Sequence, residues 1–225
     1  MQTKKIFTVV ITLLLLITAC AGLSRRKNEE ALKKVKKVAV VAFDTVQPKP
    51  TVGMATNNGK ADEMFAEFAK IFGTLTHWEV MPISRMKENA GYKAAYEKTM
   101  HGFQNKYLAS KDEKKFTVPK ILDNDCLRLL GKDGRDALMK ALGVDAIVTS
   151  RVVVVHGGSV FSGLKPQAKL SFEVYVPHMN SSDWFEGNID GEESKTSIGR
   201  TTFFNADKQG ELALPSAVSA FQKIK

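Results

Sequence analysis

The feature that most constrains the fold of this chain is a short, continuous apolar run, Val38 to Phe43, which ends at Asp44. An uninterrupted run of this length, rich in valine, is typical of a strand that is covered on both faces. We therefore expect a strand over 35–43 in the interior of a sheet. Residues 45–59 contain two prolines, two glycines and two asparagines, and this composition predicts a loop.

Helical periodicity appears in three further segments. Residues 60–76 carry an apolar stripe, residues 133–142 end at Gly143, and residues 210–225 carry a second stripe. A weaker pattern predicts a helix over 92–108. The stripes are Met64, Phe68, Phe72 and Leu75 in the first helix, and Leu214, Val218, Phe221 and Ile224 in the last.

Strands are expected between these helices. The clearest is 169–176, in which apolar and polar residues alternate as in a half-buried antiparallel strand. The other expected strands are 78–81, 144–155 (with a turn at His156-Gly157-Gly158), 184–189 and 201–204. This order predicts an α/β (α+β) fold in which helices pack on one mixed, twisted sheet.

The first 20 residues have the order of an export signal. Two lysines precede an apolar run from Ile6 to Ile17, which is followed by Thr18-Ala19-Cys20. The stretch Ile17-Thr18-Ala19-Cys20 resembles the lipobox of bacterial lipoproteins, and the resemblance implies cleavage after residue 19 and lipidation of Cys20. Because Ala21 rather than Asp follows Cys20, the resemblance favours the outer membrane, facing the periplasm. An ordinary secretory signal with a chance cysteine is the alternative.

The expected organisation is a signal peptide over 1–19, a lipidated tether over 20–34, and one domain over 35–225. Loss of Lys4 and Lys5 with the signal reduces the net charge from +9 to +7. This charge favours anionic partners, which in a cell envelope are lipid headgroups, glycans or acidic proteins rather than nucleic acid. With Cys20 lipidated, Cys126 has no disulfide partner in the chain, and its apolar neighbours predict a buried thiol.

Three blocks carry a family resemblance, namely 37–43, 78–85 and 138–150. They resemble the envelope lipoproteins that share the fold of the TolB N-terminal domain, including the curli-secretion lipoprotein and the lipoprotein activators of penicillin-binding proteins. The most specific block is Leu142-Gly143-Val144-Asp145-Ala146. The resemblance implies a fold and an envelope role but no catalytic site, because the matched residues are structural.

Residues 84–125 depart from that pattern and are interpreted as a possible insertion. Its lysine-rich, aromatic part, 84–118, is a candidate partner surface, since long segments that a fold does not require are often functional. The alternative is an ordinary helix pair whose aromatic side chains face the core. The candidate contact residues are Tyr92, Lys93, Tyr96, Phe103, Lys106 and Tyr107.

Motifs for catalysis or cofactor binding were not found. The four histidines have no metal-ligand spacing, Ser162 and Lys165 lack the companion motifs of acyl enzymes, and no P-loop is present. Acidic residues over 183–193 are interpreted as a solvated hairpin. We therefore expect no cofactor, no metal and no enzyme activity, but a binding or accessory protein of envelope assembly, secretion or peptidoglycan synthesis. The alternatives are a subunit of an oligomeric secretion pore and a surface lipoprotein that binds host molecules.

Overall fold

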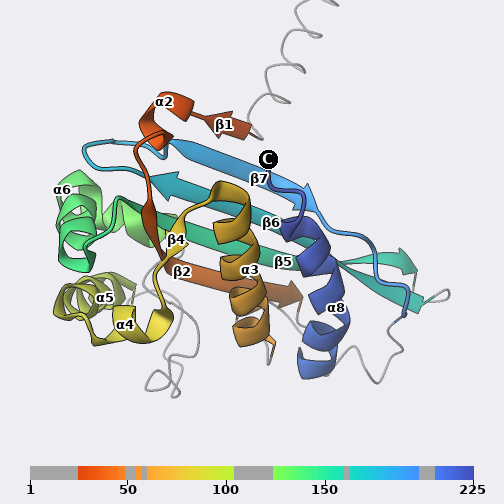
Figure 1. Ribbon diagram of the computed structural model, residues 1–225. Coiled ribbons are helices and arrows are strands. Elements are labelled where there is room, and N and C mark those ends of the chain that lie inside the picture. Colours follow the sequence, from red (N-terminus) through yellow and green to blue (C-terminus); the bar gives the residue numbers. More distant parts are fainter. Residues whose placement is uncertain (1–24, 49–53, 57–59, 104–123, 160–162, 198–205) are drawn as a thin grey trace, which may run out of the picture.

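The computed structural model describes residues 25–48, 54–56, 60–103, 124–159, 163–197 and 206–225 (Figure 1). The strands are β1 (Arg25–Lys27), β2 (Lys37–Pro48), β3 (Met54–Thr56), β4 (Glu79–Val80), β5 (Ala146–Ser159), β6 (Gly163–Tyr175) and β7 (Trp184–Asp190). The helices are α2 (Glu29–Leu32), α3 (Ala61–Thr76), α4 (Ile83–Glu88), α5 (Ala90–Phe103), α6 (Asn124–Leu142) and α8 (Ala206–Phe221).

The described strands form one mixed sheet. Its order is β1-β7-β6-β5-β2-β3, and β4 pairs with the first residues of β2. The strand β2 is parallel to β4 and β5, whereas the pairs β5–β6, β6–β7, β7–β1 and β2–β3 are antiparallel. The expected α/β class, with helices packed on one mixed sheet, is confirmed.

Helices cover both faces of the sheet (Figure 1). The helices α3 and α8 lie on one face, and α4, α5 and α6 lie on the other, which gives two hydrophobic cores with β2 between them. A bulge in β2 separates Val40 from Ala42 in the register with β5. Val41 and Ala42 consequently both face the second core, while Val40 and Phe43 face the first.

The first core is built on the aromatic stripe of α3. Phe68 and Phe72 are fully buried and their ring centroids lie 5.3 Å apart. Phe72 in turn contacts Phe172 of β6 at 5.5 Å and Trp184 of β7 at 5.9 Å. The predicted helix over 60–76 and its stripe are therefore confirmed, except that Leu75, at the end of the stripe, is 44% exposed.

Other expected elements are also present. The helix α6 is kinked at Gly131, and the helix expected over 133–142 is the part of α6 that follows this kink. Gly143, at φ +65°, ends α6. The carboxylate of Asp145 accepts hydrogen bonds from the main-chain N–H groups of Lys36 and Lys37, both at 2.9 Å. This turn residue therefore fixes the start of β2 beside the start of β5.

Two strands run further than their sequences suggest. Asp44 does not end β2, because it pairs with Arg151 of β5 across the sheet at 3.4 Å, and pairing continues to Val46. His156 and the two following glycines do not turn the chain either, since they pair with β6. A Cβ atom on Gly157 would lie 2.2 Å from the carboxylate of Glu193, so this glycine makes room for a side chain rather than a turn.

The last helix buries only part of the expected stripe. The buried residues of α8 are small, chiefly Ala213, Ala217 and Ala220, with Phe221 at the end. Leu214 and Val218 of the predicted stripe are only partly buried, while Ile224, beyond the helix, is buried. The expected strand over 201–204 lies outside the described residues.

Candidate functional site

A groove lies where the first and last described segments of the chain meet. The strand β1, the helix α2, the C-terminal end of α3, the start of β7 and the residues after α8 converge at one end of the molecule (Figure 1). They enclose a cavity of about 370 Å³, which we call the terminal groove. Its lining residues are Lys27, Glu29, Leu32, Lys33, Leu75, Thr76, Trp78, Trp184, Ile224 and Lys225.

One wall of the groove is a segment that was expected to be a tether. Residues 25–27 instead form β1, which pairs with the edge strand β7 in the register Arg25↔Glu186 and Lys27↔Trp184. Leu32 of α2 is 6% exposed and belongs to the first core. Residues 25–34, which were assigned to the tether, therefore belong to the described fold, which extends ten residues ahead of Val35, where the domain was expected to begin.

Asn28 connects this segment to the sheet. Its main-chain N–H donates to the carbonyl oxygen of Asp183 at 2.7 Å, and its side-chain amide donates to the Asp183 carboxylate at 3.4 Å. The side-chain oxygen of Asn28 also accepts from the N–H of Ala31, which caps the first turn of α2. One residue thus ends β1, starts α2 and holds both against β7.

Two acidic residues behind the groove, Asp183 and Glu186, are buried, which corrects part of the solvated hairpin expected over 183–193; its other acidic residues are exposed. Glu186 accepts from Nε of Arg25 at 2.8 Å and from the indole N–H of Trp184 at 3.1 Å. Asp183 accepts from Asn28 and from the main-chain N–H of Val176 at 3.3 Å. Buried carboxylates require such partners, and half of these partners come from the N-terminal segment.

The floor of the groove is aromatic. Trp78 and Trp184 meet edge to face with ring centroids 6.1 Å apart, and Nζ of Lys27 lies 4.1 Å from the ring centroid of Trp184. Trp184 is 2% exposed, whereas Trp78 is partly exposed. Leu75 adds one of the two large hydrophobic side chains that are exposed among the described residues. These side chains form an apolar surface that runs from the buried Trp184 to the exposed Leu75.

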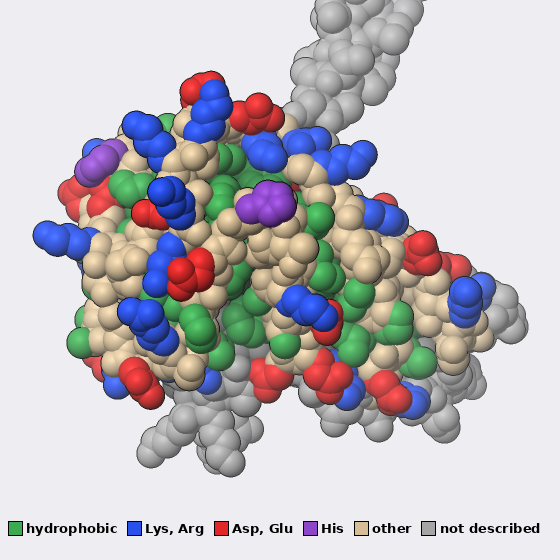
Figure 2. All heavy atoms as spheres, viewed as in Figure 1, with side chains coloured by type: hydrophobic (Ala, Val, Ile, Leu, Met, Phe, Trp, Pro, Cys, Tyr) green, Lys and Arg blue, Asp and Glu red, His purple; other side chains and the backbone are tan. Residues whose placement is uncertain are grey.

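The rim of the groove is basic. Of its charged lining residues, Lys27, Lys33 and Lys225 are positive and Glu29 is negative. Residues 25–36 contain six basic and two acidic residues, so this short segment carries +4 of the charge of +7 expected after loss of the signal. Figure 2 shows Lys and Arg side chains gathered around β1 and α2, with hydrophobic side chains between them and the end of α3.

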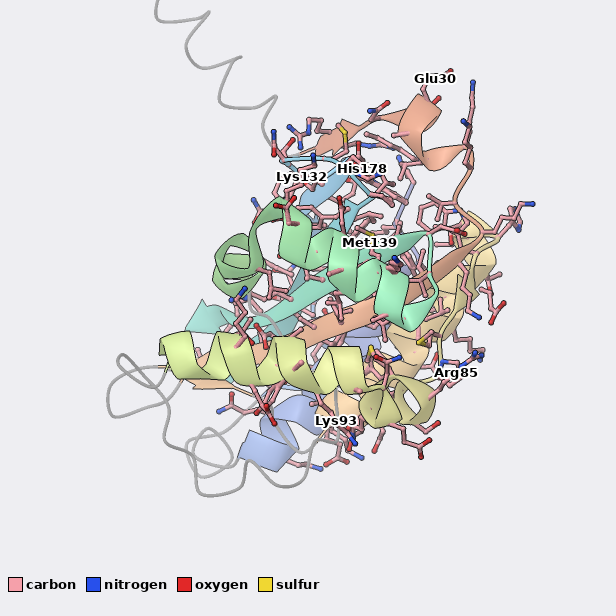
Figure 3. All side chains as sticks on the ribbon, turned by 90° about the vertical axis from the view of Figure 1, so that its left-hand side faces the viewer. Glu30, Arg85, Lys93, Lys132, Met139 and His178 are labelled. Carbon is pink, nitrogen blue, oxygen red and sulfur yellow. The ribbon has the colours of Figure 1, made fainter. Side chains whose placement is uncertain are left out.

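The six candidate partner residues of 84–118 do not form one described surface. Tyr92 is 2% exposed and lies in the second core, so it is a core residue rather than an exposed contact. Tyr96 is partly buried against the same core, and Lys93 is exposed on the edge of α5 that faces away from α6 (Figure 3). Phe103 belongs to α5, but its side chain, and all of Lys106 and Tyr107, lie outside the described residues.

The aromatic residues of this segment therefore include core residues, as the alternative interpretation expected. Helix α4, which the sequence did not predict, contributes Met86 to that core. Asn89 connects α4 to α6 by donating from its side-chain amide to the carbonyl oxygen of Ala141 at 2.8 Å. In its described part, 84–103, the possible insertion is thus integrated into the helical layer of the second core.

Other residues singled out in the sequence are dispersed. Lys165 pairs with Glu193 at 3.6 Å, His178 pairs with Asp136 at 3.0 Å, and His156 lies in β5, where burial lowers its pKa. Cys20 and Ser162, and the side chain of Cys126, lie outside the described part of the chain. Within that part, no cluster of three or more His, Cys, Asp or Glu residues is arranged to hold a metal ion.

Comparisons with known proteins identify no relative. No family model, no curated protein and no solved structure matches this chain. Across the described ranges, no helix combines the length and the apolar character needed to cross a membrane. The terminal groove was not found from the sequence because its two tryptophans lie far apart in the chain. The one sequence signal that could have found it is the basic run over 25–36.

Proposed function

We propose that this chain is a lipid-anchored protein of the bacterial envelope whose domain binds a partner through the terminal groove. The observation that carries the proposal is the short distance in sequence between the lipobox cysteine and the sheet. Cys20 precedes Arg25 by five residues, and Arg25 is already paired with Glu186 of β7.

The reach of this connection is short. Five residues span at most about 17 Å when fully extended. A lipid on Cys20 would therefore keep β1, and with it the terminal groove, close to the membrane surface. A flexible tether ending at Lys34 would have allowed the domain a much wider range of positions relative to the membrane. Because β1 is paired with the sheet, the anchor instead determines which end of the domain faces the lipid.

The lining of the groove supports binding rather than bond-making. Its lining residues are three lysines, one glutamate, one threonine and a set of apolar residues. A cavity of about 370 Å³ with an apolar floor and a few charged groups is of the size and character of small-ligand sites. The resemblance to the TolB-domain lipoproteins also favours a binding role, because the roles expected in that family are those of binding and accessory proteins.

Lipidation is tested at the two cysteines of the chain. Cells producing the protein are supplied with labelled fatty acid, and the native sequence is compared with Cys20→Ala and with the matched control Cys126→Ala. We expect label and membrane association in the native protein and in Cys126→Ala, and loss of both in Cys20→Ala. Label retained by Cys20→Ala would refute the proposed anchoring.

A further inference from the structure

We propose that the terminal groove binds an anionic phospholipid of the membrane that holds the anchor, with the phosphate at its lysine rim and the glycerol and first acyl carbons on its aromatic floor. This inference rests on the proposed lipid anchoring for its ligand source. It adds a ligand-binding site to a segment that the sequence presents only as a tether.

The rim supplies the chemistry for a phosphate. Lys27, Lys33 and Lys225 all line one cavity together with Glu29, and Lys33 also pairs with the exposed carboxylate of Glu30. Lys27 is held in place, since its Nζ lies over the ring of Trp184 and donates to the main-chain oxygen of Lys225 at 3.3 Å. Lysine is a point-charge donor suited to phosphate groups that can adopt several orientations.

The floor supplies an amphipathic surface. Trp78 is partly exposed, Leu75 is exposed and Ile224 is buried, and all three line the groove. Tryptophan is enriched at the boundary between lipid headgroups and acyl chains, where one part of its ring system is wet and the other is in contact with hydrocarbon. A free phosphate ion would use the rim but not this floor, whereas a phospholipid uses both.

The position of the groove selects the lipid among anionic ligands. The connection from Cys20 holds β1 within about 17 Å of the anchor, and residues 25–36 carry a net charge of +4. Each basic residue close to an anionic surface adds attraction of about 1 kcal/mol, a factor of about five in partitioning. With the proposed anchor in place, the anionic phospholipids of that membrane are held within reach of the groove.

The test uses the intrinsic fluorescence of the protein, because both tryptophans of the chain line the groove. A chain beginning at residue 21 retains every described element but carries no lipid. It is mixed with vesicles of phosphatidylcholine, alone or with phosphatidylglycerol, in which the acyl chains near the headgroup are brominated to quench tryptophan. We expect quenching that requires phosphatidylglycerol.

Two variants and two matched controls locate the site. Lys33→Gln is expected to lower the partition coefficient about fivefold, and Leu75→Gln is expected to reduce quenching by shallower insertion. The controls are Lys93→Gln, an exposed lysine on α5, and Met179→Gln, which alters the other exposed large hydrophobic residue, 37% exposed. Both controls should change partitioning less than twofold. Unfolding midpoints equal to that of the parent chain show that all four variants are folded.

Three results would overturn the inference. They are equal quenching by vesicles without phosphatidylglycerol, equal loss in the control variants, and a fluorescence change of the same size with inorganic phosphate alone, which would indicate a phosphate site rather than a lipid site. Because the tested chain has no anchor, its failure to bind vesicles refutes this inference while labelling of Cys20 still supports the anchoring. Binding by the groove without labelling of Cys20 refutes only the lipid anchoring in the proposed function.

Discussion

Replacing Leu32 by alanine tests whether the N-terminal segment belongs to the fold. Leu32 is 6% exposed and packs into the first core from the single turn of α2. Removing a buried leucine side chain typically costs about 2–5 kcal/mol, from lost burial and from the cavity that remains. We expect about 2–3 kcal/mol here, because a one-turn helix at the edge of the core has room to move inward and fill part of the void.

Leu75 is the matched control for this change. It is a leucine that lines the same groove but is 44% exposed, so Leu75→Ala removes little buried surface and should cost less than about 1 kcal/mol. The measurement is equilibrium unfolding in urea of the chain from residue 21. With a slope of about 2–3 kcal/mol per molar, Leu32→Ala should lower the midpoint by about 1 M and Leu75→Ala by a small fraction of that.

Midpoints for both leucine variants that equal the midpoint of the parent chain would refute the reasoning. They would show that residues 25–34 contribute nothing to folding and act as the tether that the sequence suggests. A chain beginning at residue 33 extends the test, because it lacks β1, Asn28 and Leu32 together. We expect this chain to be destabilised beyond the single substitution, since Asp183 and Glu186 then lose buried partners.

Three further changes test other parts of the fold. Gly191→Ala should prevent close packing of α8, because the new Cβ would lie 1.9 Å from the main-chain oxygen of Ser216; a melting temperature within a degree of the parent would contradict this. Asp145→Ala should cost about 1–2 kcal/mol in urea unfolding by removing an acceptor for two main-chain N–H groups, while Asp145→Asn should cost less; equal costs would assign the effect to charge. Because burial lowers the pKa of His156, the folded chain binds its proton less readily than the unfolded chain, so stability should fall as the pH drops below about 6.5. His156→Gln should flatten that part of the pH profile, and an unchanged slope would show that other groups produce it.

The architecture was predictable where side-chain periodicity coincides with burial. The stripe of α3 and the alternation of β6 each determine one buried face, and the sequence displays both directly. The α8 stripe misled for a physical reason. Its helix approaches the sheet mainly through alanines, with Phe221 buried at its end, while Leu214 and Val218 lie on the flank. Periodicity of large side chains does not reveal a contact made by small ones.

Strand ends were predicted less well because they depend on the neighbouring strand. Asp44 and His156 are polar residues that usually interrupt a buried run, yet β2 and β5 continue past them. The reason at Asp44 is its cross-strand partner Arg151, which lies far along the chain and is not visible from the local pattern. A glycine in the sequence is an ambiguous signal for a turn in the same way, since Gly157 lies within a strand and leaves space for the carboxylate of Glu193.

The basic N-terminal segment, residues 25–34, both docks on the sheet and presents positive charge at the surface. Its sequence is polar, so its only apolar anchor is Leu32, and no periodicity marks β1 as a strand. Arg25 is directed to the nearly buried carboxylate of Glu186, where opposite charges strengthen docking, and Asn28 is directed to Asp183. Lys33 remains on the surface, 65% exposed, beside Glu30. Buried and surface charges respond differently to salt, because screening acts mainly on the exposed ones. The docking of β1 also rests on main-chain pairing with β7 and on the buried side chain of Leu32, neither of which salt screens. Salt should therefore weaken the attraction of the rim to an anionic surface well before it weakens the docking of β1.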